Sequence, residues 1–421
     1  MGKIKKIWKW LGPGLITGAS DDDPSGIATY SIAGAKIGPA ILWTMLYSLP
    51  MMIALQEMSA RIGLASRCGL AGNLKRYYSK FLLILFASLI VIANVFNIGA
   101  DVSGMAASIN LLLPPSINGA YQLVSIILVL VIISLTIILP YRKMVMIFKW
   151  LSLSLGAYII AGIIAVNNWQ NVILNTIVPT IKLDKDFFIL LLAILGTTIS
   201  PYLPVWQASE EAEEKKSDGK ITRVCKFRTI AGKEIAHADG DAAFGMFFSN
   251  VIGFFIIALT GSVIFGAGIQ NIETIKDSAE ALRPLAGPYA YWFFALGLVS
   301  AGLLAIPILA GSAAYVVAEV FGWEASLDKP FNKAKGFYFI IIIATILGLG
   351  ITYSGISPIK ALFYTAILHG LVGPVLIGAL IHMSNNPKIV GPNKSKPAYN
   401  FFAYLAMILL SIGAVFFFTT L

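Results

Sequence analysis

The chain has 421 residues, of which 57% are apolar and only 12% are charged, and its mean hydropathy is +0.81. A soluble domain carries roughly 45–50% apolar and about 25% charged residues, so the composition excludes a cytosolic enzyme, a disordered protein and a nucleic-acid binder. The formal net charge of +10 is typical of a membrane protein with Lys and Arg in its cytoplasmic loops. We therefore expect the lipid bilayer as its main partner.

Cysteine usage points to neither a disulfide framework nor a metal cluster. Cys68 and Cys225 are too few and too far apart in the sequence to predict either. The basic start of the chain is not followed by a small-residue cleavage pattern, so we expect no cleavable signal peptide.

Apolar segments of membrane-crossing length recur along the chain. A helix crosses about 30 Å of hydrocarbon with roughly 20 residues, and eleven segments meet this length. Their ranges are 12–34, 38–58, 81–109, 121–139, 148–166, 187–208, 243–267, 289–320, 337–354, 357–383 and 398–418. They are apolar on every face, which favours helices over alternating β-barrel strands. The sequence predicts an all-α polytopic membrane protein with one integral domain over residues 1–421.

The distribution of Lys and Arg predicts the orientation. If the N-terminus is cytosolic, 25 of the 31 Lys and Arg residues fall on the inner side. Cytoplasmic loops carry such an excess. We therefore expect an odd number of spans in the plasma (cytoplasmic) membrane, with the N-terminus in the cytosol and the C-terminus outside.

Prolines interrupt two of the predicted spans, Pro24 in the first and Pro201 in the sixth. Proline removes a backbone donor from a helix, and unwound backbone at membrane depth survives only beside protein or a watery cavity. The two spans are equivalent if 1–166 and 187–383 form inverted repeats of five helices each, with 398–418 as an extra helix. Paired breaks at such positions point to a transporter's substrate site; two ordinary proline kinks are the alternative.

Three consecutive acids lie beside the first break. An ionised carboxylate at mid-bilayer costs at least about 2.5–3.5 kcal/mol, and no Lys or Arg lies within a helical turn or two of Asp21, Asp22 and Asp23. A cation or a wide water-filled vestibule would compensate this cost. The sequence leaves open whether Asp21 and Asp22 contact an ion or only line a solvated cavity.

Side chains around the two breaks offer only oxygen as a ligand. Carboxylate, carbonyl and water oxygens suit Mg, Ca and Mn, and Mg²⁺ binds through one or two carboxylates while it keeps several waters. Small residues leave room for such a hydrated ion. The candidate metal ligands are Asp23, Ser25, Gly26, Thr197, Ser200, Asp22 and Asp21, and the candidates for a pathway or supporting role are Thr198, Tyr202, Gln207 and Asp101.

Five stretches of the chain resemble the NRAMP divalent-metal transporters. They are GPG at 12–14, Asp23-Pro24 with GIATYSIAGA after it, LQEMSARIG at 55–63, INLLL at 109–113 and ILGTTISP at 194–201. The resemblance spans nearly the whole chain. It implies the inverted-repeat, amino-acid-transporter type of fold with eleven helices. It also implies a transporter of divalent metal ions, with no enzymatic activity and no cofactor other than the transported ion.

The departures from that family fall on its ligands. NRAMP proteins read Asp-Pro-Gly-Asn in the first helix, whereas this chain keeps the Asp as Asp23 and has Gly26 in place of the Asn. In the sixth helix the metal-ligating Met becomes Ser200, and two His positions become Tyr202 and Gln207.

The proton path of the family is also altered. One acid of the third helix aligns near Ile98, the other is kept as Asp101, and the ninth helix, 337–354, has no basic residue. These changes resemble the NRAMP-related magnesium transporter branch. That resemblance implies Mg²⁺ as the substrate, Mn²⁺ as a further substrate and transport without proton coupling.

Three alternatives to a magnesium transporter stay compatible with the sequence. One is a proton-coupled NRAMP symporter of Mn²⁺ or Fe²⁺, and another is a Na⁺-coupled amino-acid symporter, although three successive Asp would repel a substrate carboxylate. The third is a polytopic membrane enzyme whose Asp cluster holds a metal for phosphotransfer, with Asp239 and Asp241 as the inner candidates. The charged segment 209–241 is expected to be a solvated loop. The oligomeric state stays open and is compatible with a monomer.

Overall fold

The structure is a computed structural model, and it describes most of the chain. The described residues are 17–18, 20–114, 120–139, 143, 155–216, 225, 227–230 and 232–419. The GPG motif at 12–14, the beginnings of the predicted spans 12–34 and 148–166, and part of the segment 209–241 lie outside the described residues.

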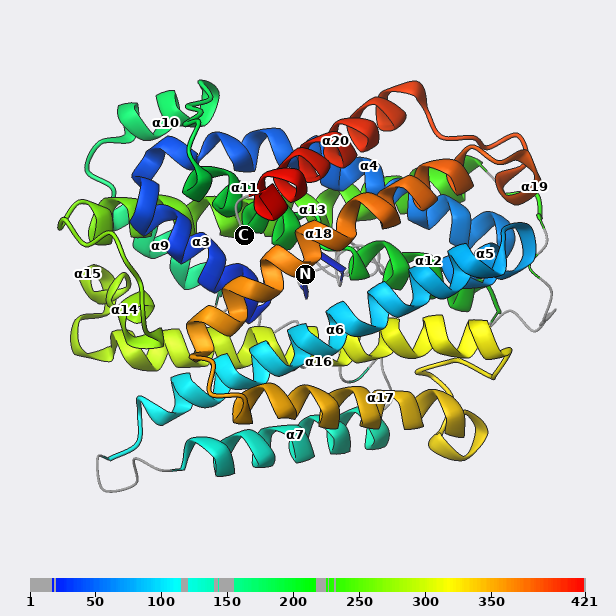
Figure 1. Cartoon of the computed structure of the whole chain (residues 1–421), viewed down its shortest axis with the longest axis horizontal. Coiled ribbons are helices and arrows are strands. Elements are labelled where there is room, and N and C mark those ends of the chain that lie inside the picture. The colour runs from blue at the N-terminus through cyan, green and yellow to red at the C-terminus, as the bar shows by residue number, and fades with distance from the viewer. Residues whose placement is uncertain are drawn as a thin grey trace, which may run out of the picture.

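Within the described ranges the regular elements are all helical (Figure 1). The helices are α3 (Pro24–Ile37), α4 (Trp43–Ser66), α5 (Leu70–Tyr77), α6 (Lys80–Asn110), α7 (Tyr121–Ile138), α9 (Gly156–Ala165), α10 (Trp169–Ile177), α11 (Lys185–Thr198), α12 (Tyr202–Lys216), α13 (Gly232–Thr260), α14 (Ile275–Glu280), α15 (Arg283–Ala286), α16 (Ala290–Phe321), α17 (Lys335–Leu349), α18 (Pro358–Ser384), α19 (Pro387–Val390) and α20 (Pro397–Thr419). Short helical turns are η1 (Gly38–Ile41), η4 (Gly261–Phe265), η5 (Gly287–Tyr289), η6 (Phe331–Lys333) and η7 (Gly350–Tyr353).

Each predicted span coincides with a helix, the first and the fifth over their described parts. In the part of the chain that the structure describes, eight helices are long and apolar enough to cross a membrane, or up to ten if each of two sharply bent pairs counts as one span. The bent pairs are α3 with η1 and α4, at 108°, and α9 with α10, at 118°. Eleven crossings therefore stay a prediction, whereas the polytopic helical architecture is confirmed.

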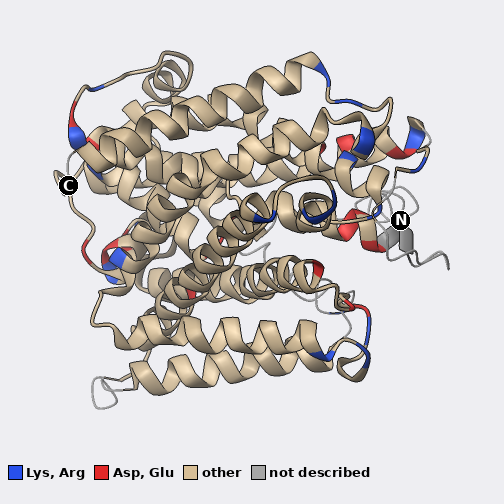
Figure 2. Cartoon of the chain, turned by 45° about the vertical axis from the view of Figure 1, so that its right-hand side comes forward, with Lys and Arg blue, Asp and Glu red and all other residues tan. Residues whose placement is uncertain are grey.

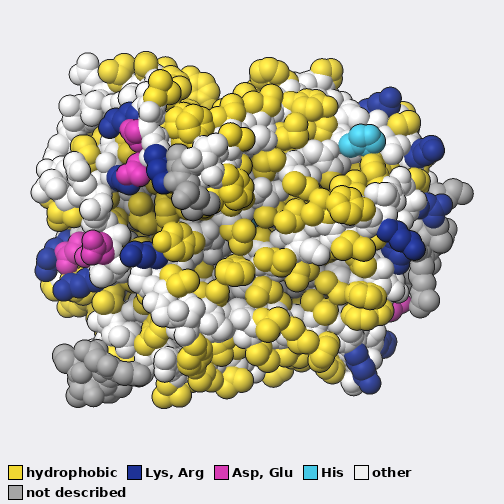
Figure 3. Space-filling model, viewed as in Figure 1, with side chains coloured by type: hydrophobic (Ala, Val, Ile, Leu, Met, Phe, Trp, Pro, Cys, Tyr) yellow, Lys and Arg dark blue, Asp and Glu magenta, His cyan; other side chains and the backbone are white. Residues whose placement is uncertain are grey.

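The outer surface of the helix bundle is that of a membrane protein. Charged side chains gather at two opposite ends, and the band between them is almost free of charge (Figure 2). Apolar side chains cover that band in the space-filling view (Figure 3). Large apolar residues such as Leu130 on α7 and Phe401 on α20 are more than half exposed, which costs little in lipid.

Helix packing is reciprocal between the two halves of the chain. α3 packs against α13 while α12 packs against α4, and α6 pairs with α16. Such exchanges are expected if α3 corresponds to α12 and α4 to α13. On one side of the bundle, α6, α16, α17 and α7 run side by side (Figure 1). The repeat limits 1–166 and 187–383, and the extra helix 398–418, stay predictions.

The segment 209–241 is not the solvated loop that its charges predicted. α12 continues through its charged residues to Lys216, and α13 already begins at Gly232. Glu210, Glu211 and Asp241 are buried. The Tyr315 hydroxyl on α16 donates to Glu210 at 3.3 Å. A polar side chain of a neighbouring helix therefore stabilises this buried carboxylate, and the sequence does not reveal that contact. The loop prediction is therefore wrong at both ends of this segment.

A disulfide joins Cys68 and Cys225, contrary to the expectation from their separation of 157 residues. Their Cα atoms lie 5.5 Å apart. The Arg228 amide donates to the Ala65 carbonyl at 2.9 Å, and the Tyr77 hydroxyl donates to the Cys225 carbonyl at 3.3 Å. The chain therefore returns from α12 to the α4–α5 corner, which sequence spacing alone does not show.

Replacing both Cys68 and Cys225 by Ser is expected to lower the thermal unfolding temperature in detergent. The open chain gains conformational freedom in the unfolded state, which lowers the free energy of unfolding by about 2–4 kcal/mol. Tryptophan fluorescence during heating measures the shift, with unreduced wild type as the control. Rapid maleimide labelling of both thiols in the folded, unreduced wild type would contradict the pairing.

Candidate metal centre

The first break lies directly before α3. Backbone around Asp21 is helical, the helix stops at Asp22 and Asp23, and α3 starts at Pro24. Asp23 is the N-cap residue, and its Oδ1 accepts from the Gly26 amide at 2.7 Å. A carboxylate at this position satisfies an amide that has no partner within the helix, and proline is favoured at the first helical position. Pro24 therefore begins the second half-helix rather than kinking the middle of one.

The second break separates α11 from α12. α11 ends at Thr198 and α12 begins at Tyr202. The Ser200 hydroxyl donates to the Thr197 carbonyl within the break. This carbonyl lacks its helical partner because residue 201 is a proline, and the Ser200 hydroxyl supplies a hydrogen bond in its place. The span is interrupted where the sequence predicted, because Pro201 supplies no amide to continue the helix.

The two breaks meet at Gly26. A Cβ atom placed on Gly26 would lie 3.3 Å from Thr197 Oγ1, 3.5 Å from the Asp21 carbonyl oxygen and 3.5 Å from Asp23 Oδ1. The absence of a side chain at Gly26 therefore lets oxygens from both breaks lie close to one another around this residue. The carbonyl of Gly26 itself lies in the first turn of α3, where helix hydrogen bonding uses it. Gly26 as a metal ligand stays a prediction, and its missing side chain is what brings the two breaks together at this position.

The Asp23 carboxylate is held from α6 by Asn97. Asn97 Nδ2 donates to Asp23 Oδ2 at 2.7 Å, and the amide is fully buried. The Ser25 hydroxyl donates to the other oxygen at 2.8 Å. The family resemblance drew attention to Ile98, which instead packs in an apolar cluster. The four-residue spacing between Asn97 and Asp101, which puts both on one helix face, was the signal that could have found Asn97.

Asp101 lies on the same face of α6 and is also part of the centre. It is fully buried, and its carboxylate has no side-chain hydrogen-bond partner among the described residues. Its electrostatic neighbours are Asp23 and the Ser25 backbone. The structure thus brings this acid to the first break.

The carboxylates of Asp21 and Asp22 turn toward α13. The Ser249 hydroxyl lies 2.7 Å from Asp21 Oδ2 and 3.3 Å from Asp22 Oδ1. Asp21 Oδ1 and Asp22 Oδ2 have no partner among the described residues. The backbone carbonyl of Asp21 therefore lies beside Gly26, whereas its carboxylate contacts Ser249 on α13. No local sequence pattern marks Ser249 as part of the centre.

The remaining candidates cross-link the broken helices. Thr198 Oγ1 lies 2.9 Å from the Tyr30 hydroxyl. Tyr202 donates to the Ser20 carbonyl at 2.9 Å. Gln207 Oε1 accepts from the Thr17 hydroxyl at 2.8 Å and Gln207 Nε2 donates to Glu211 at 3.0 Å. Each bond joins one broken span to the other or continues along α12, so these side chains fix the relative position of the half-helices.

Negative charge at the centre has no basic partner. Asp21, Asp22, Asp23 and Asp101 are each at most 2% exposed, and none forms an ion pair within the part of the chain that the structure describes. No three His, Cys, Asp or Glu side chains in the described ranges converge to hold a metal. The arrangement suits a hard cation held by one or two carboxylates, neutral oxygens and water.

The chain is similar to known metal transporters over almost its full length. Residues 14–420 match the Nramp family model, described as natural resistance-associated macrophage protein-like. The divalent metal cation transporter MntH of Caldanaerobacter subterraneus subsp. tengcongensis is 24% identical over 396 residues, covering 92% of this chain and 87% of the relative.

Solved structures show the same fold. The Eremococcus coleocola manganese transporter aligns with a TM-score of 0.72 and 19% identity, over 97% of this chain and 86% of that chain. MhsT in complex with L-phenylalanine aligns with a TM-score of 0.63 and 13% identity, over 95% and 98%. These likenesses confirm the predicted fold class, an all-α polytopic membrane protein of the inverted-repeat type with broken helices one and six.

Asn97→Ala is expected to weaken binding of Mg²⁺ or Mn²⁺ by about tenfold, because loss of a group that orients a ligand carboxylate typically costs 10–100-fold. Isothermal titration of the purified protein measures the change. Asn94→Ala is the matched control, since the Asn94 amide bonds to α16 at Leu309 and Ser312. Equal loss of affinity in both variants would mean that Asn97 only stabilises the fold.

Proposed function

The chain belongs to the Nramp family, and we propose on this premise that it imports Mg²⁺, and also Mn²⁺, without coupling to protons. The family and its relatives establish a multi-pass membrane transporter of divalent metal cations. The identity of the ion and the driving force are the parts proposed here. We also propose that the ion binds at Asp23 and the space beside Gly26.

The gathering of oxygens from both breaks around Gly26 is the observation that carries the choice of ion. Mg²⁺ dehydrates reluctantly and usually keeps several of its waters, so its site needs room as well as charge. Gly26, Ser25 and Ser200 are small, so movement of the half-helices would make room for such an ion, and oxygens of both breaks lie around Gly26. Neither break contains a sulfur or imidazole group, so nothing within it selects for transition metals.

Charge at the centre supports a divalent cation over a neutral or anionic substrate. The buried carboxylates of Asp23 and Asp101 repel an anionic group and gain from a cation. An inside-negative membrane potential supplies about 2.3 kcal/mol per charge per 100 mV, and a divalent ion experiences twice that. Import therefore requires no proton, and the helix that spans 337–354 carries no basic residue.

Transport requires the two broken helices to separate. The centre is closed from both ends in the structure, because its side chains are almost fully buried. The Thr17–Gln207 bond joins the halves that lie on the predicted cytosolic side of each break. In alternating access this bond breaks, the centre opens toward the cytosol and the ion is released. Asn97 on α6 keeps its hydrogen bond to Asp23 during this movement.

A proton-coupled Mn²⁺ symporter is the second candidate, and Asp101 is the observation that favours it. A carboxylate that is buried beside a second carboxylate, as Asp101 is beside Asp23, is suited to taking up a proton. A membrane enzyme and an amino-acid symporter have less support. Asp239, the expected inner residue of an enzyme site, is paired with Arg61 at 2.7 Å, and the likeness to MhsT concerns the fold.

Uptake by proteoliposomes with the full chain distinguishes uniport from proton symport. An imposed inside-negative potential is expected to drive Mg²⁺ and Mn²⁺ uptake at equal internal and external pH, because the ion's own charge couples to the potential. Fluorescent dyes report internal Mg²⁺ and pH, with empty liposomes as the control. Uptake that responds to a pH gradient and not to the potential would overturn the uniport mechanism.

Asp23→Asn is expected to reduce Mg²⁺ affinity by about 100-fold, because removing one partner of a buried charge pair costs about 3 kcal/mol or more. Titration calorimetry and liposome flux measure the loss. Asp186→Asn is the matched control, since Asp186 is exposed and pairs with Lys36. Unchanged heats in Asp23→Asn would place the ion elsewhere.

Gly26→Asn tests the size argument separately. The added side chain enters the space bordered by Thr197 and Asp21 oxygens, so less water fits around the ion. We expect Mg²⁺ flux to fall about tenfold or more and Mn²⁺ flux to fall less, measured in the same liposomes. A parallel decrease for both ions would show that room for water does not set the ion preference.

A further inference from the structure

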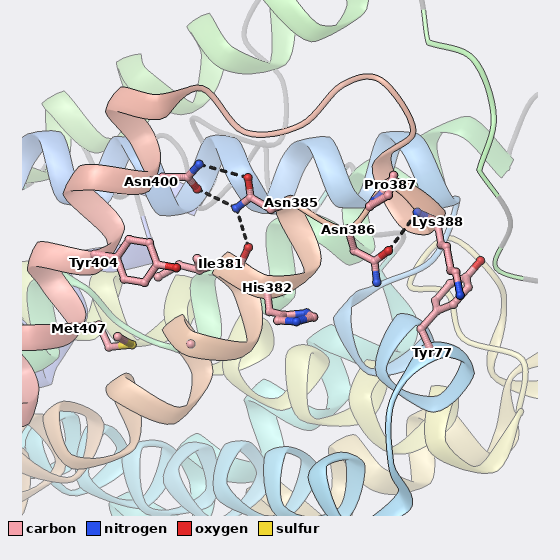
Figure 4. A pocket seen from close by; sticks show the side chains of 11 residues that line it. Tyr77, Ile381, His382, Asn385, Asn386, Pro387, Lys388, Asn400, Tyr404 and Met407 are labelled. Atoms are coloured by element: carbon pink, nitrogen blue, oxygen red, sulfur yellow. Dashed lines mark hydrogen bonds between the residues drawn. The ribbon is translucent and has the colours of Figure 1, made fainter.

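A second polar cavity lies far along the chain from the metal centre. Its volume is about 800 Å³, and it opens where α18 ends and α20 begins, beside the end of α5 (Figure 4). These helix ends coincide with the limits of the predicted spans 357–383 and 398–418. The cavity is therefore at the expected boundary between lipid and water, on the side that the basic loops predict to be cytosolic.

The wall nearer the water is cationic. Lys388 lines it, and the Lys388 ammonium forms no ion pair within the described part of the chain. No acidic side chain is among the described residues that line the cavity. In the space-filling view, the Lys and Arg side chains nearest the His lie toward the same end of the molecule, and acidic side chains gather mainly at the opposite end (Figure 3).

His382 adds an imidazole to the same wall. Its Nδ1 lies 2.6 Å from the Tyr78 hydroxyl, and Asn386 Nδ2 donates to that hydroxyl at 3.5 Å. When Asn386 donates to Tyr78, the Tyr78 hydroxyl is free to donate to Nδ1. With Nδ1 as the acceptor of that bond, the ring N–H is at Nε2, where it is available to an acceptor.

Two amides at the back of the cavity are already satisfied by each other. Asn385 Nδ2 donates to Asn400 Oδ1 at 2.8 Å, and Asn400 Nδ2 donates to Asn385 Oδ1 at 3.1 Å (Figure 4). This pair joins α20 to the end of α18 and shapes the wall. Lys388 and His382 are therefore lining residues whose donors are available to a ligand. Together they suit a singly charged anion with several acceptor oxygens.

The opposite wall is apolar and continues onto the lipid-facing surface. Ile381, Tyr404 and Met407 line it. Along α20, Tyr404 and Ile408 are about half exposed, so an alkyl chain that leaves the cavity can follow this helix into the bilayer. A ligand that fits both walls has an anionic head and an apolar tail.

We infer that this cavity binds the headgroup of an anionic phospholipid, with its phosphate at Lys388 and His382 and its acyl chains along α20. A lipid source is favoured over free phosphate because the apolar wall adds contacts that only an acylated ligand makes. Basic pockets between transmembrane helices on the cytoplasmic side recognise such headgroups. Neither the family nor the metal centre requires this site.

Native mass spectrometry of the full chain, released from nanodiscs of phosphatidylcholine with phosphatidylglycerol, tests the assignment. Wild type is expected to retain phosphatidylglycerol over phosphatidylcholine. Lys388→Gln is expected to reduce that retention about fivefold, because one Lys near a phosphate contributes about 1 kcal/mol. Adding His382→Gln to this variant is expected to reduce the retention further.

Lys394→Gln is the matched control, because Lys394 is an exposed cation of the same loop that does not line the cavity. It is expected to retain the lipid as wild type does. Equal loss in Lys388→Gln and Lys394→Gln would show general surface attraction and overturn the site. Displacement by inorganic phosphate at equal strength in micelles of neutral detergent would assign the cavity to free phosphate instead.

Discussion

A carboxylate in the membrane interior is stable only where its charge is compensated, and this constraint governs the centre of the protein. Asp21, Asp22, Asp23 and Asp101 are buried without a basic partner in the described part of the chain. Hydrogen bonds from Ser249 and Asn97 satisfy some of their oxygens. Hydrogen bonds alone rarely offset the desolvation of several charges, and this is the physical reason for proposing that a cation completes the site.

Helix breaks make that compensation possible. A continuous helix uses its amides and carbonyls internally, whereas a break leaves some of them available at membrane depth. Asp23 caps the new helix start with its own side chain, and Asn97 fixes the carboxylate from a helix that is not broken. The half-helices are joined by side chains such as Tyr202 and Gln207. Asp23 is therefore held by an unbroken helix, while the half-helices are held to each other by side-chain hydrogen bonds, which the proposed transport would have to break.

At one end of the bundle, charged side chains form ion pairs that join different helices. Arg61 on α4 pairs with Asp239 on α13 at 2.7 Å, and Lys396 before α20 reaches the same carboxylate at 3.5 Å. The guanidinium of Arg61 also lies over the Tyr399 ring of α20. The Cys68–Cys225 disulfide and the cavity between α18 and α20 lie among the loops of these same helices. This end thus binds the C-terminal helix to the core and presents cationic groups toward the lipid headgroups.

The sequence by itself determined the membrane class, the positions of the helices and the two breaks, because hydropathy and proline act locally. Only the tertiary structure decided which oxygens meet at Gly26, that Asn97 rather than Ile98 contacts Asp23, and that Asp21 and Asp22 turn to Ser249. It also decided the disulfide and the burial of Glu210 and Glu211. These are contacts between residues distant in the chain, and their geometry depends on how whole helices pack, which no local pattern records.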